Sequence, residues 1–445
     1  MNFPKDISEA IVITGNDLVE AYRYDESHIV GSVPIAVVKP RGSKALRELV
    51  RLAKTEGFGL VPRGAGTGKA GGCTPISRNV VVDMCEYSGE ITVSQQDLCL
   101  RGPASAMLKD IKAAALDVGL YYPPDPNSWD ICMFGGSLAT NAGGPTSCKY
   151  GMTRNWVLAV EALMDDGELH AFGIPSVKCN TGPSIEQLLI GSEGIFGIIV
   201  SATVRLMPKP LQLLTLLLPV DQWHDLLGLP GRLVSAGYLP CAFEFWDPAV
   251  MRDLRTFGPE EARRMPGKAL ALLEFDDHDC QSESFMEGIL ETLGPLAEYL
   301  QIATDAHQRD ALWAVRRITS VHIKERYPKK VSEDIVVPRS SISAFFDGIE
   351  AMGLPIITYG HLGDGNLHVN LLEAGDIKSS VLESQLLALF ELCISLGGAI
   401  SGEHGIGNAK KWAFTRLADP YHLHSIRAIK QALDPCGIFN PGKVI

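Results

Sequence analysis

The chain has 445 residues, too many for one ordinary hydrophobic core, so two or more domains are expected. Its 46% hydrophobic and 21% charged residues are typical of a packed globular enzyme and exclude an extensively disordered chain. The formal net charge of −12 argues against a nucleic-acid-binding protein, although a local cluster of arginine or lysine can still bind an anionic substrate.

The ten cysteines are scattered along the chain. No two form a Cys-x-x-Cys pair, so their spacing indicates neither an iron–sulfur cluster nor a zinc ribbon, and we expect buried thiols in a reducing cytosol. Residues 1–6 lack the charged and apolar regions of a signal peptide, and apolar runs such as 211–220 are about half a membrane span. The sequence predicts a cytoplasmic protein without a transmembrane segment, reaching a membrane only peripherally or through a partner.

The first 208 residues alternate strand and helix signals. Residues 35–38 indicate a buried strand, and Ser43 is predicted to cap a helix that Gly57 stops. A second strand starts at Leu60 and completes a short β-α-β unit. Further strands are predicted at 79–84, 156–164 and 195–206, and helices at 106–118 and 184–189.

Pro208 and Pro210 lie close together and predict a domain boundary. Beyond them the pattern changes to longer helices between strands, which is α+β in character. The helices are predicted at 312–323 and 380–396, and the strands at 271–275 and 354–358.

A glycine-rich segment, 61–72, follows a predicted strand, and its backbone N–H groups could converge on an anion. Its Gly-x-Gly-x-x-Gly match is weak evidence for a Rossmann fold, because residues 73–77 do not continue as an amphipathic helix. A Walker A loop fails as well, since Arg63 stands where the first glycine belongs and Ala70 where Ser or Thr should hold magnesium. A glycine turn without a ligand is the alternative.

Two more glycine clusters make that alternative less attractive. Residues 135–144 follow the proline-rich stretch 123–126, and a third cluster occupies 191–197. Three separated loops with small side chains suit a long dinucleotide lying against backbone better than a small anion.

A different chemistry is indicated by His361, His368 and Glu403, which can together hold a divalent ion such as Zn, Mn or Fe(II). Glycines between the two histidines favour a strand–turn–strand that brings the imidazoles together. His404 would then act as a base, provided that a turn at the neighbouring glycines brings Glu403 and His404 into one pocket. The alternative is that these histidines are hydrogen-bonded core residues.

Taken in order, these segments resemble the FAD-dependent oxidoreductases of the vanillyl-alcohol oxidase and p-cresol methylhydroxylase superfamily, in the branch of the glycolate oxidase flavoprotein, D-lactate dehydrogenase and D-2-hydroxyglutarate dehydrogenase. The resemblance runs from about residue 22 to the C-terminus. It implies an α+β fold with three parts: a FAD-binding domain of two α+β subdomains at 1–208, an α+β cap domain with an antiparallel sheet at 209–405, and a segment at 406–445 that returns to the FAD domain. Its markers are 62–72, 123–127, 135–144, 191–197, 312–316, 333–338, 360–370, 401–405 and 439–443.

The resemblance also implies which residues bind FAD, without a covalent link because the pyrophosphate loop offers no histidine. Those at the pyrophosphate would be Arg63, Gly64, Ala65, Gly66, Thr67 and Gly68. The rest of the cofactor would be lined by Pro124, Asp125, Gly136, Ser137, Thr140, Gly143, Gly144, Glu193 and Ile198, with Asn440 on the flavin side.

For the substrate, the resemblance implies that Arg316 binds the carboxylate of a 2-hydroxy acid, with Asn370 completing a polar wall. The alternative for Arg316 is a charge on a helix surface. The family's lysine before the strand at 334–338 falls on Ser332 here, and Lys330 is the nearest candidate, which weakens the hydroxyglutarate interpretation. The metal would lower the pKa of the hydroxyl, and His404 would take its proton as hydride leaves for flavin N5.

The sequence thus predicts a FAD-dependent dehydrogenase of a D-2-hydroxy acid, D-lactate or glycolate, with D-2-hydroxyglutarate as the alternative. Electrons would pass to an iron–sulfur subunit, an electron-transfer flavoprotein or a quinone. Rival interpretations are a non-catalytic FAD electron-transfer subunit and, less consistent with the motifs, a nucleotide hydrolase.

Overall fold

The computed structural model describes residues 3–258, 260–303, 305–372 and 380–445, and the chain divides into two compact units. The first contains Met1–Gly143, Met152–Lys209 and Glu403–Ile445, and the second Gly144–Gly151 and Pro210–Gly402. The division after Lys209 lies beside the predicted boundary. Gly144–Gly151 groups with the second unit, and the chain re-enters the first unit at Glu403. Among the described residues, no helix is both long and apolar enough to cross a membrane.

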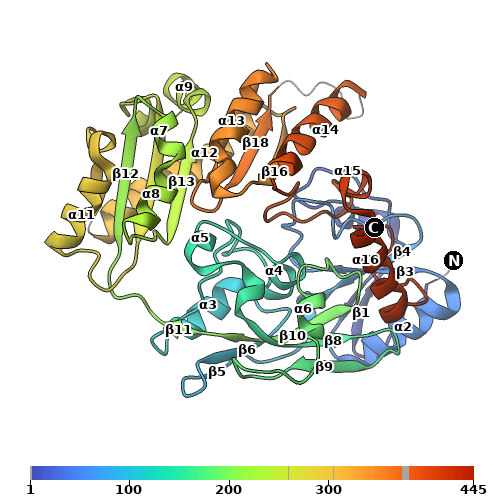
Figure 1. Ribbon diagram of the computed structural model, residues 1–445. Helices are drawn as coiled ribbons and strands as arrows, with labels where there is room; N and C mark the ends of the chain where they lie inside the picture. The colour runs from blue at the N-terminus through green and yellow to red at the C-terminus, as the bar shows by residue number, and fades with distance from the viewer. Residues whose placement is uncertain (1–2, 259, 304, 373–379) are drawn as a thin grey trace. The chain divides into compact units, whose positions relative to one another are not determined.

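The first unit opens with a four-stranded sheet in the order β1-β2-β4-β3 (Figure 1). Its elements are β1 (Ala10–Ile13), α1 (Asn16–Val19), β2 (Ala36–Pro40), α2 (Ser43–Glu56), β3 (Gly59–Arg63) and β4 (Asn79–Asp83). Strands β2, β4 and β3 are parallel, and β1 pairs antiparallel with β2. Helix α2 begins at Ser43 itself without a side-chain cap, so the capping role predicted for Ser43 is wrong, whereas Gly57 ends the helix in the left-handed conformation as predicted.

A five-stranded antiparallel sheet, ordered β5-β6-β10-β8-β9, forms the second subdomain of this unit. The strands are β5 (Thr92–Ser94), β6 (Cys99–Pro103), β8 (Val157–Leu163), β9 (Leu169–Gly173) and β10 (Ile198–Arg205). The helices are α3 (Leu108–Leu116), α4 (Phe134–Thr140) and α6 (Ile185–Leu189), and β7 (Leu120–Tyr121) pairs with β11 (Met207–Pro208). The predicted strands and helices of this region are confirmed to within a few residues at each end.

The C-terminal segment packs against the first sheet. It forms α15 (Lys411–Leu417) and α16 (Pro420–Leu433), then makes a parallel bridge between Phe439 and Leu60 of β3. The amide of Asn440 donates to the carbonyl of Leu60 at 2.8 Å. The chain end is therefore held beside the strand that leads into the first glycine-rich loop.

The second unit is built on a seven-stranded antiparallel sheet in the order β15-β12-β14-β13-β17-β18-β16. The strands are β12 (Leu214–Val220), β13 (Ala242–Trp246), β14 (Ala269–Phe275), β15 (Gln301–Ala303), β16 (Val331–Val336), β17 (Ile356–His361) and β18 (Asn366–Leu371). The helices are α5 (Ser147–Tyr150), α7 (His224–Leu227), α8 (Leu229–Ser235), α9 (Pro248–Phe257), α10 (Glu260–Arg263), α11 (Glu283–Leu293), α12 (Ala306–Arg326), α13 (Ile342–Ala351) and α14 (Ser380–Ser395). The fold is α+β, as the sequence predicts.

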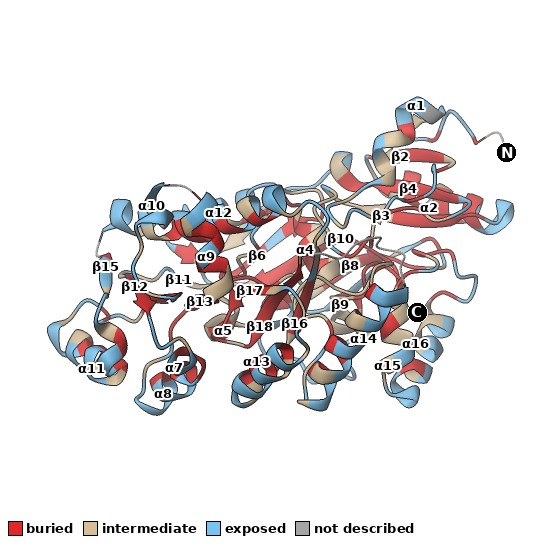
Figure 2. Ribbon diagram, turned by 90° about the horizontal axis from the view of Figure 1, so that it is seen from above, coloured by how far each residue is buried: buried red, intermediate tan, exposed pale blue. Residues whose placement is uncertain are grey.

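Helices cover both faces of this sheet (Figure 2). Helices α9 and α12 lie on one face, and α7, α8, α11 and α13 on the other. Because side chains alternate along a strand, Phe243 and Phe245 of β13 face away from Glu244. On the face of Glu244, the indole of Trp246 donates to Thr319 of α12 at 2.7 Å. The face under α12 thus carries both apolar core and polar residues.

Candidate active site

A cavity of about 460 Å³ lies in the first unit, and all three glycine-rich loops contribute to its wall. Most residues predicted to bind the cofactor line it. They are Arg63, Gly64, Ala65, Gly66, Thr67, Gly68, Gly136, Ser137, Thr140, Gly143, Glu193 and Ile198. The loops that were predicted to act together therefore enclose one space.

Gly136 shows that this space suits a ligand. A Cβ placed on Gly136 would meet no atom within 4 Å, so any side chain there would project into the cavity. The glycine thus leaves open a volume that a larger residue would fill. A wall of backbone and small side chains is what a flavin dinucleotide needs in order to lie close to the chain.

Pro124, Asp125, Gly144 and Asn440 are not among the described residues that line the cavity. Lys112 holds two of them, since its Nζ donates to the Pro124 carbonyl at 2.7 Å and lies 2.9 Å from an Asp125 carboxylate oxygen. Gly144 begins the stretch that groups with the second unit.

Asn440 has a bracing contact pattern. Its Nδ2 donates to the carbonyls of Gly72, at 2.9 Å, and Glu193, at 2.6 Å. It therefore joins the first and third glycine-rich loops from beneath, and any effect of Asn440 on the cofactor would include the placement of those loops.

Glu193 is a buried carboxylate that holds the segment after His404. Its Oε1 accepts hydrogen bonds from the amides of Ile406, at 2.7 Å, and Gly407, at 3.0 Å. Burial raises the pKa of Glu193, and the two amide hydrogen bonds oppose that rise. The segment from Gly405 to Gly407 is consequently fastened to the third glycine-rich loop.

Glu403 and His404 both line the cavity, although they are adjacent in sequence. The chain is bent here, with Gly405 at φ +84°, which meets the geometric condition set by the sequence for presenting both side chains. His404 Nε2 lies 3.5 Å from a carboxylate oxygen of Glu403. The imidazole therefore stands beside a carboxylate at the wall of the cavity.

In the second unit, Glu244 joins two of the predicted site residues. One carboxylate oxygen accepts from Arg316 Nε and the other from His361 Nδ1. All three side chains are buried, and Glu244 is fully so. Burial by itself raises the pKa of Glu244, but His361 and Arg316 together outweigh it and the pKa is lowered. Glu244 is thus held as a carboxylate.

His361 and His368 come together as the sequence predicts, from strands β17 and β18. Their ring centroids are 5.4 Å apart, and His368 pairs across the sheet with Asp334 of β16. Asp334 accepts from Ser401 Oγ and from the Gly402 amide, each at 3.0 Å. Gly402 permits this approach, because a Cβ there would meet the side chain of Asn366 at 2.1 Å.

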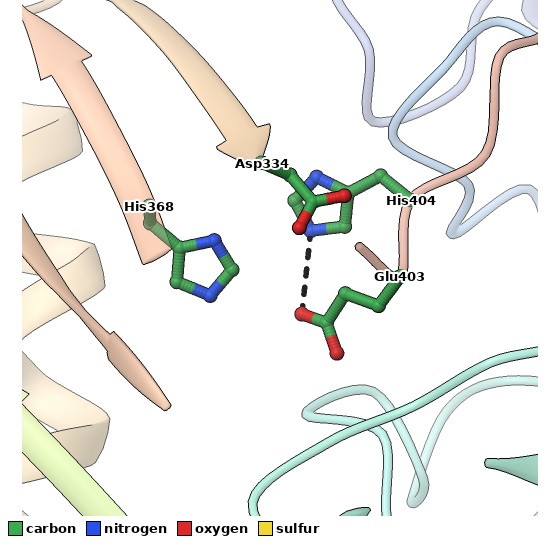
Figure 3. A group of neighbouring side chains, drawn as sticks. All are labelled: Asp334, His368, Glu403 and His404. Carbon is green, nitrogen blue, oxygen red and sulfur yellow. Dashed lines mark ion pairs between the residues drawn. The ribbon is translucent and has the colours of Figure 1, made fainter. Parts of the chain in front are cut away.

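Asp334, His368, Glu403 and His404 make up the group of candidate metal ligands drawn in Figure 3. Glu403 follows Gly402 directly, so one peptide bond and the hydrogen bonds of Asp334 connect the two pairs of residues. Carboxylates and imidazoles are the donors that Zn, Mn and Fe(II) accept, and the donor chemistry fits a divalent ion. His361 stands next to this group through its ring contact with His368.

Lys330 and Asn370 lie beside each other on the same sheet. Lys330 Nζ donates to Asn370 Oδ1 at 2.8 Å, and Asn370 is fully buried. The Arg316 guanidinium lies 5.4 Å from the ring centroid of Tyr359, the residue that pairs with His368 across the strands. The predicted carboxylate-binding and polar-wall residues are therefore on one sheet and the helix that covers it.

Sequence reasoning assigned no role to Glu244 or Asp334. A signal existed for Glu244, since a lone glutamate interrupts the apolar strand Ala-Phe-Glu-Phe-Trp. A charged residue at a buried strand position requires a partner. Nothing local in the sequence indicates that the partners are Arg316 and His361.

Comparisons with known proteins define the family. Residues 210–444 match the family described as FAD linked oxidases, C-terminal domain, and residues 34–173 match the FAD binding domain. A D-lactate dehydrogenase of Archaeoglobus fulgidus is 34% identical, covering 96% of each chain. A glycolate oxidase subunit GlcD of Bacillus subtilis is 30% identical over 99% of this chain and 97% of its own. The chain belongs to the FAD-linked oxidases, and the resemblance inferred from its motifs is confirmed.

Two further comparisons bear on the function and the fold. A D-2-hydroxyglutarate dehydrogenase of Stutzerimonas stutzeri is 30% identical, covering 97% of this chain and 96% of its own. An alkyldihydroxyacetonephosphate synthase structure superposes with a TM-score of 0.69 at 17% identity, covering 97% of this chain and 83% of that one, which shows a shared fold. The chain is a FAD-dependent oxidoreductase whose relatives are named for hydroxy acids.

Proposed function

We propose that the protein oxidises a D-2-hydroxy acid, D-lactate or glycolate, to the corresponding 2-oxo acid. The observation that carries the proposal is the buried group on one sheet face, where an arginine able to bind a carboxylate lies beside two imidazoles able to bind a metal. The relatives named D-lactate dehydrogenase and glycolate oxidase subunit support the same substrate class.

Each residue has a defined task in this proposal. The Arg316 guanidinium would donate to the substrate carboxylate, as Arg–carboxylate pairs favour a planar, charge-assisted geometry. His404 would accept the hydroxyl proton at its Nε2, the atom that faces Glu403. Bound FAD supplies the acceptor for the hydride.

His361, His368 and Glu403 would hold a divalent ion. The ion would orient a 2-hydroxy acid through its hydroxyl and one carboxylate oxygen, and would lower the pKa of that hydroxyl. Asp334 would support Glu403 by anchoring the two residues that precede it. Whether the ion is Zn, Mn or Fe is for metal analysis to decide.

D-2-Hydroxyglutarate is the alternative substrate, and one observation favours it. Lys330 and Asn370 are hydrogen-bonded to each other on the sheet that carries the histidines, and a lysine there would suit a second carboxylate. After either oxidation, we propose that electrons pass to an iron–sulfur subunit, an electron-transfer flavoprotein or a quinone, since one relative is named as a subunit.

The test is anaerobic bleaching of the flavin absorbance of the purified protein. D-Lactate, L-lactate, glycolate and D-2-hydroxyglutarate are each added with and without a chelator. We expect rapid bleaching by D-lactate or glycolate that the chelator abolishes. Bleaching by D-2-hydroxyglutarate alone would establish the alternative substrate. A yellow protein that none of the four acids bleaches would contradict the proposal and favour a subunit that only transfers electrons.

A further inference from the structure

Glu244 occupies an unusual place for a carboxylate. It stands in the third position of β13, on an entirely buried strand, directly opposite His361 of β17 in the sheet register. Both of its oxygens are used, one by the guanidinium of Arg316 and the other by the imidazole of His361. The two groups to which the proposed function gives separate tasks therefore share one partner.

Stability alone does not account for this arrangement. Moving a carboxylate out of water costs more than a well-packed apolar side chain would, even when the carboxylate is paired. An apolar residue of similar volume would serve the core among Ala242, Trp246 and Leu272 at least as well. The contact with a proposed metal ligand gives the charge a use that the core does not.

Glu274 of the neighbouring strand β14 provides a comparison within the same sheet. It is also buried, and it also pairs with an arginine of α12, Arg309, through two hydrogen bonds of 2.6 and 2.8 Å. Its other partners are Trp313 and Thr215. Glu274 thus has the same burial and the same kind of ion pair but contacts no residue assigned to the site.

We infer that Glu244 is a positioning residue that sets the orientation of both the metal-binding imidazole of His361 and the carboxylate-binding guanidinium of Arg316. This inference rests on the proposed function. By accepting at Nδ1, Glu244 makes Nε2 the nitrogen of His361 that is presented to an ion. By accepting at Nε, it directs the terminal nitrogens of Arg316 away from β13. Metal and substrate would consequently be oriented by one shared carboxylate.

The experiment compares Glu244→Gln with Glu274→Gln in the full-length, FAD-loaded protein. Glutamine preserves volume, but its NH2 group faces either the N–H of Arg316 or that of His361, so one of the two contacts becomes a clash of donors. The first readout is affinity for Zn²⁺ and Mn²⁺ measured by competition with a chelator, which needs no turnover. The second is the KM for D-lactate, with flavin content as the control for folding.

For Glu244→Gln we expect metal affinity to fall about 10–100-fold and KM to rise, with flavin content unchanged. For Glu274→Gln we expect metal affinity within about twofold of the wild type, even where stability falls. Equal metal affinity in wild type and Glu244→Gln would overturn the inference, as would equal losses in the two variants. If Glu244→Gln does not fold, Glu244→Asp keeps the charge but withdraws it by one methylene, and affinity within about twofold of wild type would overturn the inference.

The failure of the proposed function gives a different result. A wild-type protein that binds FAD but neither ion, and that no 2-hydroxy acid bleaches, would overturn both. A wild-type protein that binds metal and bleaches normally, with a Glu244→Gln variant that does the same, would overturn the positioning role alone.

Discussion

Replacing Glu193 tests whether a single carboxylate fixes the segment that carries His404. Its Oε1 accepts the amides of Ile406 and Gly407, at 2.7 and 3.0 Å, and the side chain is 7% exposed. Hydrogen bonds to a charged group contribute about 1.5–3 kcal/mol each, so the two together give about 3–6 kcal/mol. The burial that raises the pKa of Glu193 offsets part of this. We expect Glu193→Ala to lower the free energy of unfolding of the first unit by about 2–4 kcal/mol.

Glu193→Gln should cost much less, about 1 kcal/mol, because an amide oxygen can still accept from both N–H groups. All three side chains retain a Cβ, so the left-handed backbone at φ +53° is strained equally in each. The assay is guanidinium unfolding in excess FAD, followed by tryptophan fluorescence and by release of flavin. The exposed Glu90, in the same unit, provides the matched control as Glu90→Ala.

The loss should also reach the chemistry. Because Glu193 fastens the residues just after His404, Glu193→Ala should slow substrate-driven flavin bleaching by more than its loss of bound flavin explains. A Glu193→Ala protein that unfolds and bleaches like Glu90→Ala would refute the reasoning, since it would mean that the segment is held by other contacts.

Three other residues of the first unit give predictions of their own. His404→Ala should keep its yellow colour and its metal but lose flavin reduction by substrate, and normal reduction would contradict the assignment of the base. Gly136→Leu should fill the cavity and purify without flavin while remaining folded by circular dichroism, whereas Gly231→Leu, at an exposed helical glycine with open space around it, should keep its flavin. The pKa of Lys443 is lowered to about 8 from 10.5, chiefly by burial, so between these pH values the unfolded chain binds one more proton than the folded protein. From pH 8 to 10.5 the unfolding free energy of the wild type should therefore rise by about 3 kcal/mol relative to Lys443→Met, and parallel pH profiles would contradict a depressed pKa.

The cofactor site was largely predictable because its signal is local. Glycines 64, 66 and 68 and the clusters near 136 and 194 stand out in the sequence, and residues of all three line one cavity. The fold class and the strand–turn–strand of the two histidines were predictable for the same reason, since the glycines between them mark the turn.

What could not be predicted depends on long-range pairing. Glu244 is 72 residues from Arg316 and 117 from His361, and no spacing rule connects them. The roles of Asn440 and Glu193 as braces between loops are hidden in the same way, because their hydrogen bonds go to backbone groups. Sequence indicates which residues bear chemistry, but partners that arise from sheet register require the fold.

That register explains why a sheet suits this group of residues. Neighbouring strands lie about 4.8 Å apart, and directly opposed residues project to the same face. Glu244 opposes His361, and Tyr359 opposes His368, which in turn opposes Asp334. A shift of one residue between β17 and β18 would turn one imidazole to the other face and separate the pair. The two histidines must therefore lie on strands whose pairing is fixed, and the tight turn that begins at His361 and includes Gly365 fixes it, with the Gly365 amide donating to the His361 carbonyl at 3.1 Å.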